Sequence, residues 1–325
     1  MTQQAGGTAL ICGSVAFDTI MVFEDRFRNH ILPDKIHMLN VSFLVPQMRR
    51  EYGGCAGNIA YNLRLLGDTG FPMATVGRDA GLYLQWMNDN RVPTDYVKVI
   101  ESEHTAQGFV TTDLDDNQIW AFHPGAMQLS HLNDVTQAQK DGKGVKVGIV
   151  APDGREGMIR HAEQFAAAGI PFIFDPGQAM PLLDAETLKA FIAQATWVTV
   201  NDYEWQVVQQ RTGLNERQIL NHVQALIVTR GADGSVIHTR NGDIVIPSAK
   251  PKAVVDPTGC GDAYRAGLLH GLLHGRDWET TGRIASLLGA LKIETRGTQN
   301  HRFTAAEFAA RYRENFGTAL LPATG

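Results

Sequence analysis

The stretch Asp256-Pro257-Thr258-Gly259-Cys260-Gly261-Asp262 runs directly into the apolar residues 263–269. Three small residues followed by an apolar run predict a helix that begins near Gly261. The first N–H groups of a helix lack intrahelical acceptors, and with the positive end of the helix dipole they favour an anion. A site that only bound an anion would not place the Asp262 carboxylate beside it, because the two negative charges repel each other. The pattern therefore favours a site in which Asp262 takes a proton from a nucleophile while the N–H groups hold a transferring phosphate. A carboxylate that only complements the helix dipole is the alternative.

Composition limits the class of protein. The chain has 325 residues, 44% hydrophobic and 19% charged, with a formal net charge of -5. These values indicate a globular protein with one large core, and no basic block suggests a nucleic-acid or membrane partner. No apolar run approaches the ~20 residues that a membrane span needs, and the N-terminus lacks the features of a signal peptide. Three widely separated cysteines, Cys12, Cys55 and Cys260, fit a reducing compartment, so we expect a cytoplasmic protein.

Alternating strand and helix patterns fill residues 145–229 and predict an α/β protein, with a mainly parallel sheet covered by helices on both faces. Extended segments at 19–23 and 40–46, and a hairpin around the polar turn 113–117, do not follow this alternation. They predict a small antiparallel sheet that covers a site. We therefore expect one domain over residues 1–325, with a discontinuous β lid at about 18–50 and 103–124.

A second glycine-rich segment, Gly53-Gly54-Cys55-Ala56-Gly57, precedes Asn58 and a predicted helix. It suits close backbone approach to a hydroxylated ligand, or is an ordinary turn with an Asn helix cap. Asn201 and Glu204 have the spacing of a capping box, or face phosphate and the water shell of Mg²⁺. Thr229 and Gly231 follow a strand and either hold nucleotide phosphate or form a β-turn.

Two further candidates lie in the predicted lid and at the first strand exit. Asp18, four residues after Ser14, has two acceptor oxygens that suit a diol, although a solvated turn carboxylate has the same pattern. Phe122 either stacks on a flat ligand or packs in a core. The sequence contains neither the Walker lysine loop nor an early G-x-G-x-x-G dinucleotide loop, which argues against a P-loop enzyme and against a Rossmann dehydrogenase.

Together, Gly53–Asn58 with Gly67 and Gly77, and Asp256–Asp262, resemble the two signature motifs of the ribokinase-like (PfkB) carbohydrate and nucleoside kinase family. The resemblance covers nearly the whole chain and implies a three-layer sandwich with a small antiparallel β lid. Within that family the chain is most similar to bacterial adenosine kinases, through stretches such as Phe122-His123-Pro124-Gly125 and Glu294-Thr295-Arg296-Gly297.

The resemblance implies ATP- and Mg²⁺-dependent phosphorylation of the adenosine 5′-hydroxyl, which yields AMP and ADP and serves purine salvage. It also implies that Asp262 is the catalytic base and that the anion hole consists of Gly259, Cys260 and Gly261. The ribose would contact Asp18, Gly54 and Asn58, and the purine would be surrounded by Ser14, Ser42, Phe122 and Gln178. ATP would be bound by Asn201, Thr229 and Gly231, Mg²⁺ would be contacted through water by Glu204, and a monovalent cation such as K⁺ would be bound by Asp256 and Thr258.

Gly108 departs from the family pattern, because bacterial adenosine kinases tend to place an aromatic residue there. One stacking partner for a purine would then be missing. The alternatives are a kinase for another nucleoside or for a sugar such as ribose or fructose, and a non-catalytic nucleoside-binding protein with the same fold. The family also suggests a homodimer that pairs through the lids.

Overall fold

A nine-stranded sheet forms the centre of the molecule within the part of the chain that the computed structural model describes, residues 8–31 and 40–320. In sheet order its strands are β13 (Gly242–Ile246), β12 (Ser235–Thr239), β11 (Ala225–Thr229), β10 (Trp197–Asn201), β9 (Phe172–Phe174), β8 (Val145–Val150), β1 (Thr8–Cys12), β4 (Thr69–Gly77) and β5 (Tyr96–Ile100). The pairs β11–β12 and β12–β13 are antiparallel and the other pairs are parallel, so β12 alone runs against the remaining strands. The predicted mainly parallel sheet is therefore confirmed.

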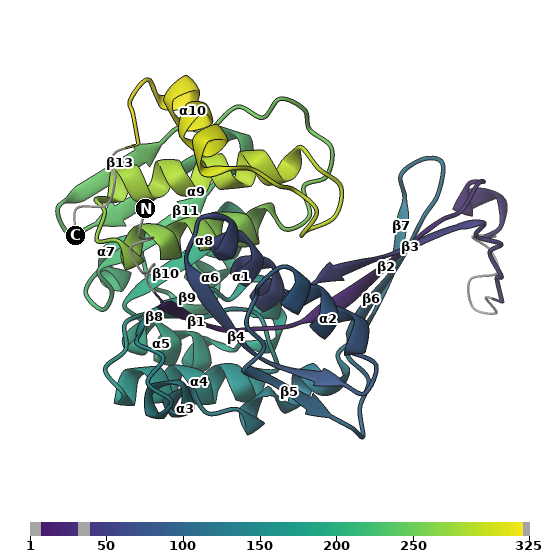
Figure 1. The fold of residues 1–325 in the computed structure, drawn as a ribbon, viewed down its shortest axis with the longest axis horizontal. Coiled ribbons are helices and arrows are strands. Elements are labelled where there is room, and N and C mark those ends of the chain that lie inside the picture. The colour runs from purple at the N-terminus through teal and green to yellow at the C-terminus, as the bar shows by residue number, and fades with distance from the viewer. Residues whose placement is uncertain (1–7, 32–39, 321–325) are drawn as a thin grey trace.

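Helices cover both faces of this sheet and complete the three-layer sandwich (Figure 1). Strand β1 shows why, because Ala9 and Ile11 enter one buried cluster while Leu10 and Cys12 enter the other, as strand alternation requires. The first cluster includes α1 (Cys55–Leu65), α2 (Gly81–Asp89), α8 (Cys260–Leu273), α9 (Trp278–Ile293) and α10 (Ala305–Phe316). The second includes α3 (Val135–Lys140), α4 (Arg155–Ala167), α5 (Ala185–Gln194), α6 (Asp202–Thr212) and α7 (Glu216–Ile219).

A second sheet of four strands projects from the sandwich as a lid (Figure 1). Its order is β3 (Gln47–Gly53), β2 (Ala16–Val22), β6 (Ala106–Thr112) and β7 (Gln118–His123). The outer pairs are antiparallel, and the central pair, β2 with β6, is parallel. The predicted small second sheet is thus present, and it is assembled from two separated parts of the chain.

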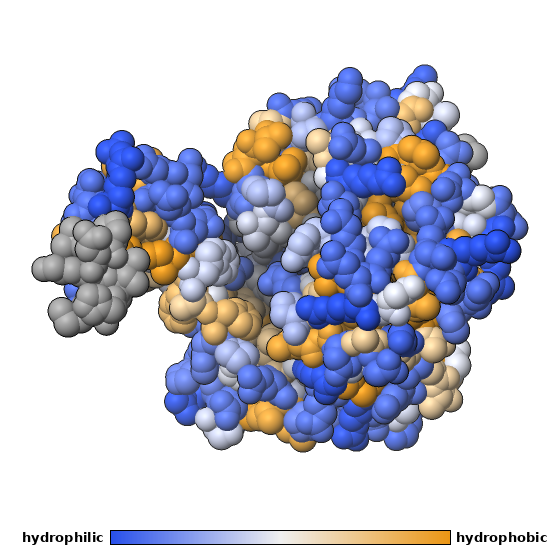
Figure 2. Space-filling model, turned by 180° about the vertical axis from the view of Figure 1, so that it is seen from behind, coloured by the Kyte–Doolittle hydropathy of each residue, from blue (hydrophilic) through white to orange (hydrophobic). Residues whose placement is uncertain are grey.

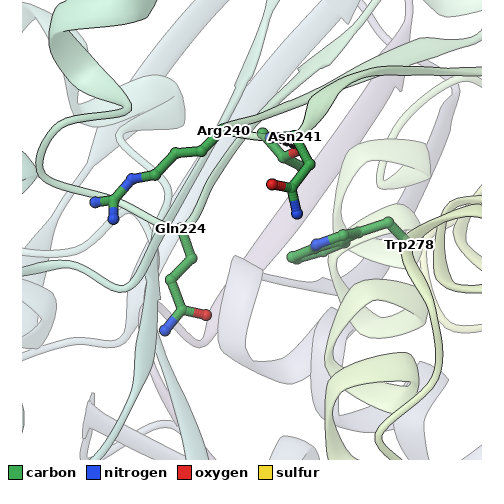
Figure 3. Close-up of a pocket in the computed structure, with 5 residues that line it drawn as sticks. Gln224, Arg240, Asn241 and Trp278 are labelled. Atoms are coloured by element: carbon green, nitrogen blue, oxygen red, sulfur yellow. Dashed lines mark hydrogen bonds between the residues drawn. The ribbon is translucent and has the colours of Figure 1, made fainter.

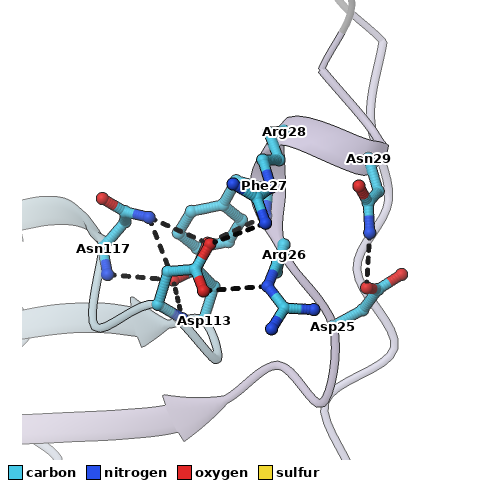
Figure 4. Close-up of polar contacts among 8 residues, drawn as sticks. Asp25, Arg26, Phe27, Arg28, Asn29, Asp113 and Asn117 are labelled. Atoms are coloured by element: carbon cyan, nitrogen blue, oxygen red, sulfur yellow. Dashed lines mark hydrogen bonds and ion pairs between the residues drawn. The ribbon is translucent and has the colours of Figure 1, made fainter.

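The turn between β6 and β7 is tied to the neighbouring segment by the buried carboxylate of Asp113 (Figure 4). Asp113 Oδ1 accepts from the Asn117 N–H at 2.9 Å, and Oδ2 accepts from the Phe27 N–H at 2.9 Å. Phe27 lies in the short 3₁₀ helix η1 (Phe27–Asn29). The hairpin predicted around 113–117 is confirmed, and its turn residue also connects the two halves of the lid.

One expectation about strands was wrong, and one strand was not predicted. Residues 40–46 are not a strand, and β3 begins at Gln47, immediately after Pro46. Pro46 has no N–H to donate to a neighbouring strand, which explains why the strand begins only after it. The sequence of β3 lacks an apolar alternation, because it contains the charged residues Arg49, Arg50 and Glu51 and both faces of the lid meet solvent. Strand β5 was missed for a similar reason, since it is a half-exposed edge strand. The part of the predicted lid at 32–39 lies outside the described residues.

Candidate active site

The start of helix α8 presents free backbone donors, as the opening motif predicted. Gly259 caps the helix with φ 77°, a left-handed conformation that side chains other than glycine adopt with strain. The Cys260 N–H donates to the Pro257 carbonyl at 3.2 Å. The N–H groups of Gly261 and Asp262 have no acceptor among the described residues. Two directed donors at a helix N-terminus can bind an anionic oxygen.

The carboxylate of Asp262 lies in this first turn and is oriented by a residue of another helix. Asn58 Nδ2 donates to Asp262 Oδ2 at 2.7 Å. Burial raises the pKa of Asp262 to about 6, although the Asn58 hydrogen bond and the Arg265 guanidinium oppose the rise. A carboxylate with a pKa near 6 is largely ionised at neutral pH and is basic enough to assist removal of a hydroxyl proton.

Asn58 is itself fixed by a network that the sequence analysis did not anticipate. Gln299 Nε2 donates to Asn58 Oδ1 at 3.0 Å, and the Trp86 indole donates to Gln299 Oε1 at 3.0 Å. The Asn58 oxygen is thus an acceptor, which leaves its NH₂ group to face Asp262. Gln299 lies two residues beyond the family-like stretch that ends at Gly297, and only the folded chain shows that it orients Asn58, which contacts Asp262.

Gly54 brings the first strand exit against the start of α1. It has φ 85°, and a Cβ there would lie 2.6 Å from both the Ala16 nitrogen and the Ser14 carbonyl oxygen. Ser14 Oγ accepts from the Cys55 N–H at 3.1 Å, and its carbonyl accepts from the Ala56 N–H at 2.9 Å. Glycine is required at this position because two backbones meet there. Ser14 accordingly helps to begin the helix that carries Asn58.

One row of the lid sheet aligns the candidate ligand-binding side chains. Glu51, Asp18, Gly108 and Phe122 are direct partners across β3, β2, β6 and β7, so they share one face. Burial, followed by the charges of Glu51 and Asp256, raises the pKa of Asp18 to about 6. Phe122 is 54% exposed, so it is not a core residue.

Trp120 lies on the same face of the lid and was not predicted. It is 55% exposed, two residues before Phe122 on β7. A Cβ on Gly108 would lie 3.1 Å from the Trp120 ring and 2.9 Å from Asp18 Oδ1. Position 108 of β6 thus lacks the aromatic side chain that the family pattern has there. The indole of Trp120, on the neighbouring strand β7, lies over this position instead.

This face of the lid forms one wall of a cleft. The cleft has a volume of ≈ 520 Å³, and Asp256, Thr258 and Gly297 line its opposite wall, across from Asp18 and Trp120. Figure 2 shows the lid standing away from the rest of the molecule at this junction. The glycine-rich motif of residues 256–262, through Asp256 and Thr258, and the lid therefore face one open space.

A second cavity, of ≈ 330 Å³, lies on the other side of the α8 start. Thr229 and Gly231 line it, as do Cys260 and Gly261. Much of the remaining wall comes from the apolar residues Val254, Ala290 and Ile293. An apolar slot that opens onto glycines and a helix N-terminus fits the base and phosphates of a nucleotide. The first residues of α8 thus line this second cavity.

Asn201 and Glu204 form the capping box that was the alternative interpretation. The Glu204 N–H donates to Asn201 Oδ1 at 2.7 Å, and Glu204 Oε2 accepts from the Asn201 N–H at 2.8 Å. Glu204 Oε2 also lies 4.0 Å from the Arg265 guanidinium. That guanidinium donates to both carboxylate oxygens of Asp175, at 2.9 and 3.0 Å. Helix capping does not exclude a role toward Mg²⁺, because Glu204 Oε1 has no hydrogen-bond partner among the described residues.

The contacts around Ser42 and Gln178 do not connect them to these residues. Ser42 is exposed, and its neighbour Phe43 packs against Phe23 and Phe27 of the lid. Gln178 is exposed in the 3₁₀ helix η4 (Gly177–Leu182). No hydrogen bond among the described residues joins either side chain to Asp262 or Asp18.

The predicted cation ligands Asp256 and Thr258 do not fit a free monovalent ion. The Asp256 backbone oxygen accepts from the Lys292 ammonium at 2.7 Å. The Asp256 carboxylate accepts from the N–H groups of Thr258 and Gly297, both at 2.9 Å. A positive charge of the chain itself therefore occupies an acceptor that the ion would need.

Other polar groupings lie apart from this site. Asp68 accepts hydrogen bonds from His270 and His274 near the far end of α8. A shallow hollow lined by Gln224, Asn241 and Trp278 (Figure 3) lies beside the beginning of β11. The candidate site is at the carboxyl ends of the parallel strands, whereas this hollow lies at the end of the sheet where the strands begin.

The sequence matches the model of a known protein family. Residues 18–305 match the pfkB family of carbohydrate kinases. The chain belongs to this family. This kinase is 32% identical to a nucleoside kinase of Methanocaldococcus jannaschii over 266 residues, which cover 81% of the chain and 85% of the relative.

Solved structures agree with this assignment. This kinase matches a Burkholderia thailandensis nucleoside kinase in complex with inosine, with a TM-score of 0.85 and 52% identity over 96% of the chain and 99% of that structure. It matches an ADP-inosine complex of the same enzyme at a TM-score of 0.84 and 54% identity, covering 96% of this chain and 97% of that one. The predicted ribokinase-like fold is confirmed, and the protein is an ATP-dependent kinase of the nucleoside and sugar kinase class. None of the described helices has the length and apolarity of a membrane span.

Proposed function

We propose that this kinase transfers the γ-phosphoryl group of ATP to the 5′-hydroxyl of adenosine and releases AMP and ADP. The observation that carries the proposal is the Asp262 carboxylate, held by Asn58 beside the free N–H groups of Gly261 and Asp262. Asp262 accepts the proton of the hydroxyl, whose oxygen forms the new bond to phosphorus as the bond to ADP breaks. The N–H groups stabilise the negative charge on the transferring group.

The lid supports a nucleoside as acceptor. Phe122 and Trp120 offer exposed aromatic faces on the side that forms the cleft, where a purine ring stacks favourably. Asp18 lies in the same row as Phe122, and its carboxylate suits the two ribose hydroxyls. A free sugar would leave the aromatic faces without a partner.

ATP would occupy the cavity lined by Thr229, Gly231 and Gly261. Glu204, and Asn201 at the end of β10, would act toward the phosphates and toward Mg²⁺ through water. Bound Mg²⁺ supplies positive charge to the phosphates, which lowers the barrier to phosphoryl transfer.

A second acceptor is favoured by a specific observation. The B. thailandensis nucleoside kinase, 52% identical, was crystallised with inosine. Inosine shares the ribose and the flat purine with adenosine and differs in the polar edge of the base. We therefore include it as the first competitor of adenosine for this kinase.

One assay decides among acceptors. ADP release would be measured with saturating ATP and Mg²⁺ for adenosine, inosine, guanosine, ribose and fructose. We expect kcat/KM for adenosine to exceed that for the free sugars by at least tenfold. A higher value for inosine would replace adenosine as the substrate, and preference for ribose or fructose would refute a nucleoside kinase. Ligand-induced thermal stabilisation without turnover would indicate a binding protein.

We also propose a homodimer through the lid. The face of the lid opposite Asp18 exposes Met48, Phe109 and Ile119, which alternate with the residues of the cleft face. A second copy would cover this apolar face and leave the cleft face accessible. Size-exclusion chromatography with light scattering should give twice the chain mass, and Phe109→Glu should give a monomer. A monomeric parent protein would refute this arrangement.

A further inference from the structure

The ammonium of Lys292 is buried without a carboxylate partner. Lys292 lies in the last turn of α9 and is 0% exposed. Its Nζ donates to the Asp256 carbonyl at 2.7 Å and to the Thr295 carbonyl at 3.3 Å, and no ion pair of Lys292 occurs among the described residues. Lysine is almost never fully buried unless its charge is compensated. Here the compensation comes from backbone oxygens, which is the type of coordination that a K⁺ ion receives.

Two features of the surroundings oppose the loss of charge that burial of Lys292 favours. The end of α9 has the negative pole of its helix dipole, which stabilises a cation. Burial lowers the pKa of Lys292, and the charges of Asp256 and Glu51 oppose this lowering. The two carbonyl oxygens that accept from the ammonium therefore hold, at this point, a cation that is part of the chain.

The ammonium also anchors the segment that leads to the anion hole. The N–H groups of Val255 and Asp256 both donate to the Ile293 carbonyl, at 2.9 and 3.1 Å. The Asp256 carbonyl is held by Lys292 from the same helix end. The backbone immediately before Pro257 and Gly259 is thus fixed to the end of α9 through both its donors and its acceptor. Loss of the positive charge would release the start of α8.

We propose that Lys292 is a tethered substitute for a monovalent cation, so that this kinase works without K⁺ and acquires a requirement for it when the ammonium is removed. Lys292 is a positioning residue, because it acts on the anion hole through the Asp256 backbone and contacts no reacting atom. The activity part of this inference rests on the proposed phosphoryl transfer. The binding part does not, because a small cation should stabilise the folded variant whatever the substrate is.

The first experiment compares chloride salts of K⁺, Na⁺, NH₄⁺ and choline at constant ionic strength with the unmodified kinase. We expect kcat in KCl and in choline chloride to agree within about twofold, and the two melting temperatures to agree within about one or two degrees. The reason is that the Lys292 ammonium already occupies the cation position. Activation by K⁺ of fivefold or more over choline would overturn the proposal, with no variant required.

The second experiment uses Lys292→Met, which keeps the length of the side chain and removes the charge. In choline chloride kcat should fall roughly 10- to 100-fold, the scale of one charge-assisted hydrogen bond. K⁺ or NH₄⁺ should restore most of it and raise the melting temperature, whereas choline should not. Lys252→Met, which changes an exposed lysine of the same region, should show none of these responses.

The outcomes separate the two proposals. A folded Lys292→Met protein with neither kinetic nor thermal response to K⁺ and NH₄⁺ would overturn the inference. If that variant does not fold, Lys292→Gln, which keeps a donor without the charge, is measured in the same salts with the same criteria. A thermal response to K⁺ in a protein that phosphorylates no nucleoside would support the cation substitution and refute the proposed function.

Discussion

Asn58 Nδ2 donates a hydrogen bond to Asp262 Oδ2 at 2.7 Å and so joins two residues that are 204 positions apart in the chain. Asn58 comes from the first turn of α1 and Asp262 from the first turn of α8. The two helices pack on the same face of the large sheet. The two glycine-rich motifs of the sequence therefore form one site, with the amide of one motif orienting the carboxylate of the other.

Asp262→Asn should lower kcat roughly 10²- to 10⁴-fold, because the amide cannot accept the proton of the hydroxyl. Burial raises the pKa of Asp262 to about 6, so the ionised carboxylate destabilises the fold at pH 7. The melting temperature of the variant should accordingly equal or exceed that of the parent protein. Steady-state kinetics and thermal unfolding provide the check, and near-normal turnover would exclude Asp262 as the base.

The pH profile should report this carboxylate. Activity requires the ionised form, so kcat should decline as the pH falls through about 6. The hydrogen bond from Asn58 lowers the pKa of Asp262, so Asn58→Ala should move this acidic limb to higher pH. Profiles of kcat for both proteins between pH 5 and pH 9 test the shift. An unchanged limb would show that Asn58 does not act on the base.

Gly54→Ala should destabilise the protein more than Gly67→Ala. Both glycines have positive φ angles, 85° and 92°, which cost an alanine roughly 1–2 kcal/mol. A Cβ at Gly67 meets nothing within 4 Å, whereas at Gly54 it would lie 2.6 Å from backbone atoms of Ser14 and Ala16. This overlap should add about 1–3 kcal/mol. Urea unfolding of both variants measures the difference, and equal losses would show that the close approach is unimportant.

Breaking the buried pair of Asp175 and Arg265 should be costly. The guanidinium binds both oxygens of the carboxylate, and both side chains are less than a tenth exposed. Asp175→Ala leaves a buried charge without its partner, at a cost of about 3–5 kcal/mol. The double variant Asp175→Ala with Arg265→Leu should lose less than the sum of the single losses. Additive losses in chemical denaturation would argue against direct coupling.

The aromatic face of the lid should act on the nucleoside alone. Trp120→Ala and Phe122→Ala should each raise KM for adenosine by roughly 5- to 100-fold, about 1–3 kcal/mol of lost stacking and burial. KM for ATP should change by less than twofold, because neither residue lines the second cavity. Leu114→Ala, at an exposed position in the turn between β6 and β7, is the control. Equal effects on both substrates would indicate a general disturbance of the lid.

The sequence alone predicted the α/β class, the mainly parallel sheet and a helix start after each glycine-rich motif. Those features follow from local patterns: alternating strand and helix periodicity, and small residues at the start of an apolar helix. It also predicted the hairpin at 113–117, because a polar turn between two apolar runs is a short-range signal. It failed for β3 and for the edge strand β5, whose exposed faces erase the apolar pattern on which such predictions depend.

The tertiary structure decided which residues meet. The order of β3, β2, β6 and β7 placed Asp18, Gly108 and Phe122 in one row and brought Trp120 over the missing aromatic position. Packing of α9 against α8 placed the Lys292 ammonium on the Asp256 carbonyl. Contacts of this kind depend on sheet order and helix packing, which are long-range properties. The sequence therefore determined the chemistry that is available, and the fold determined which groups orient the Asp262 carboxylate and which ammonium lies beside the segment that leads to α8.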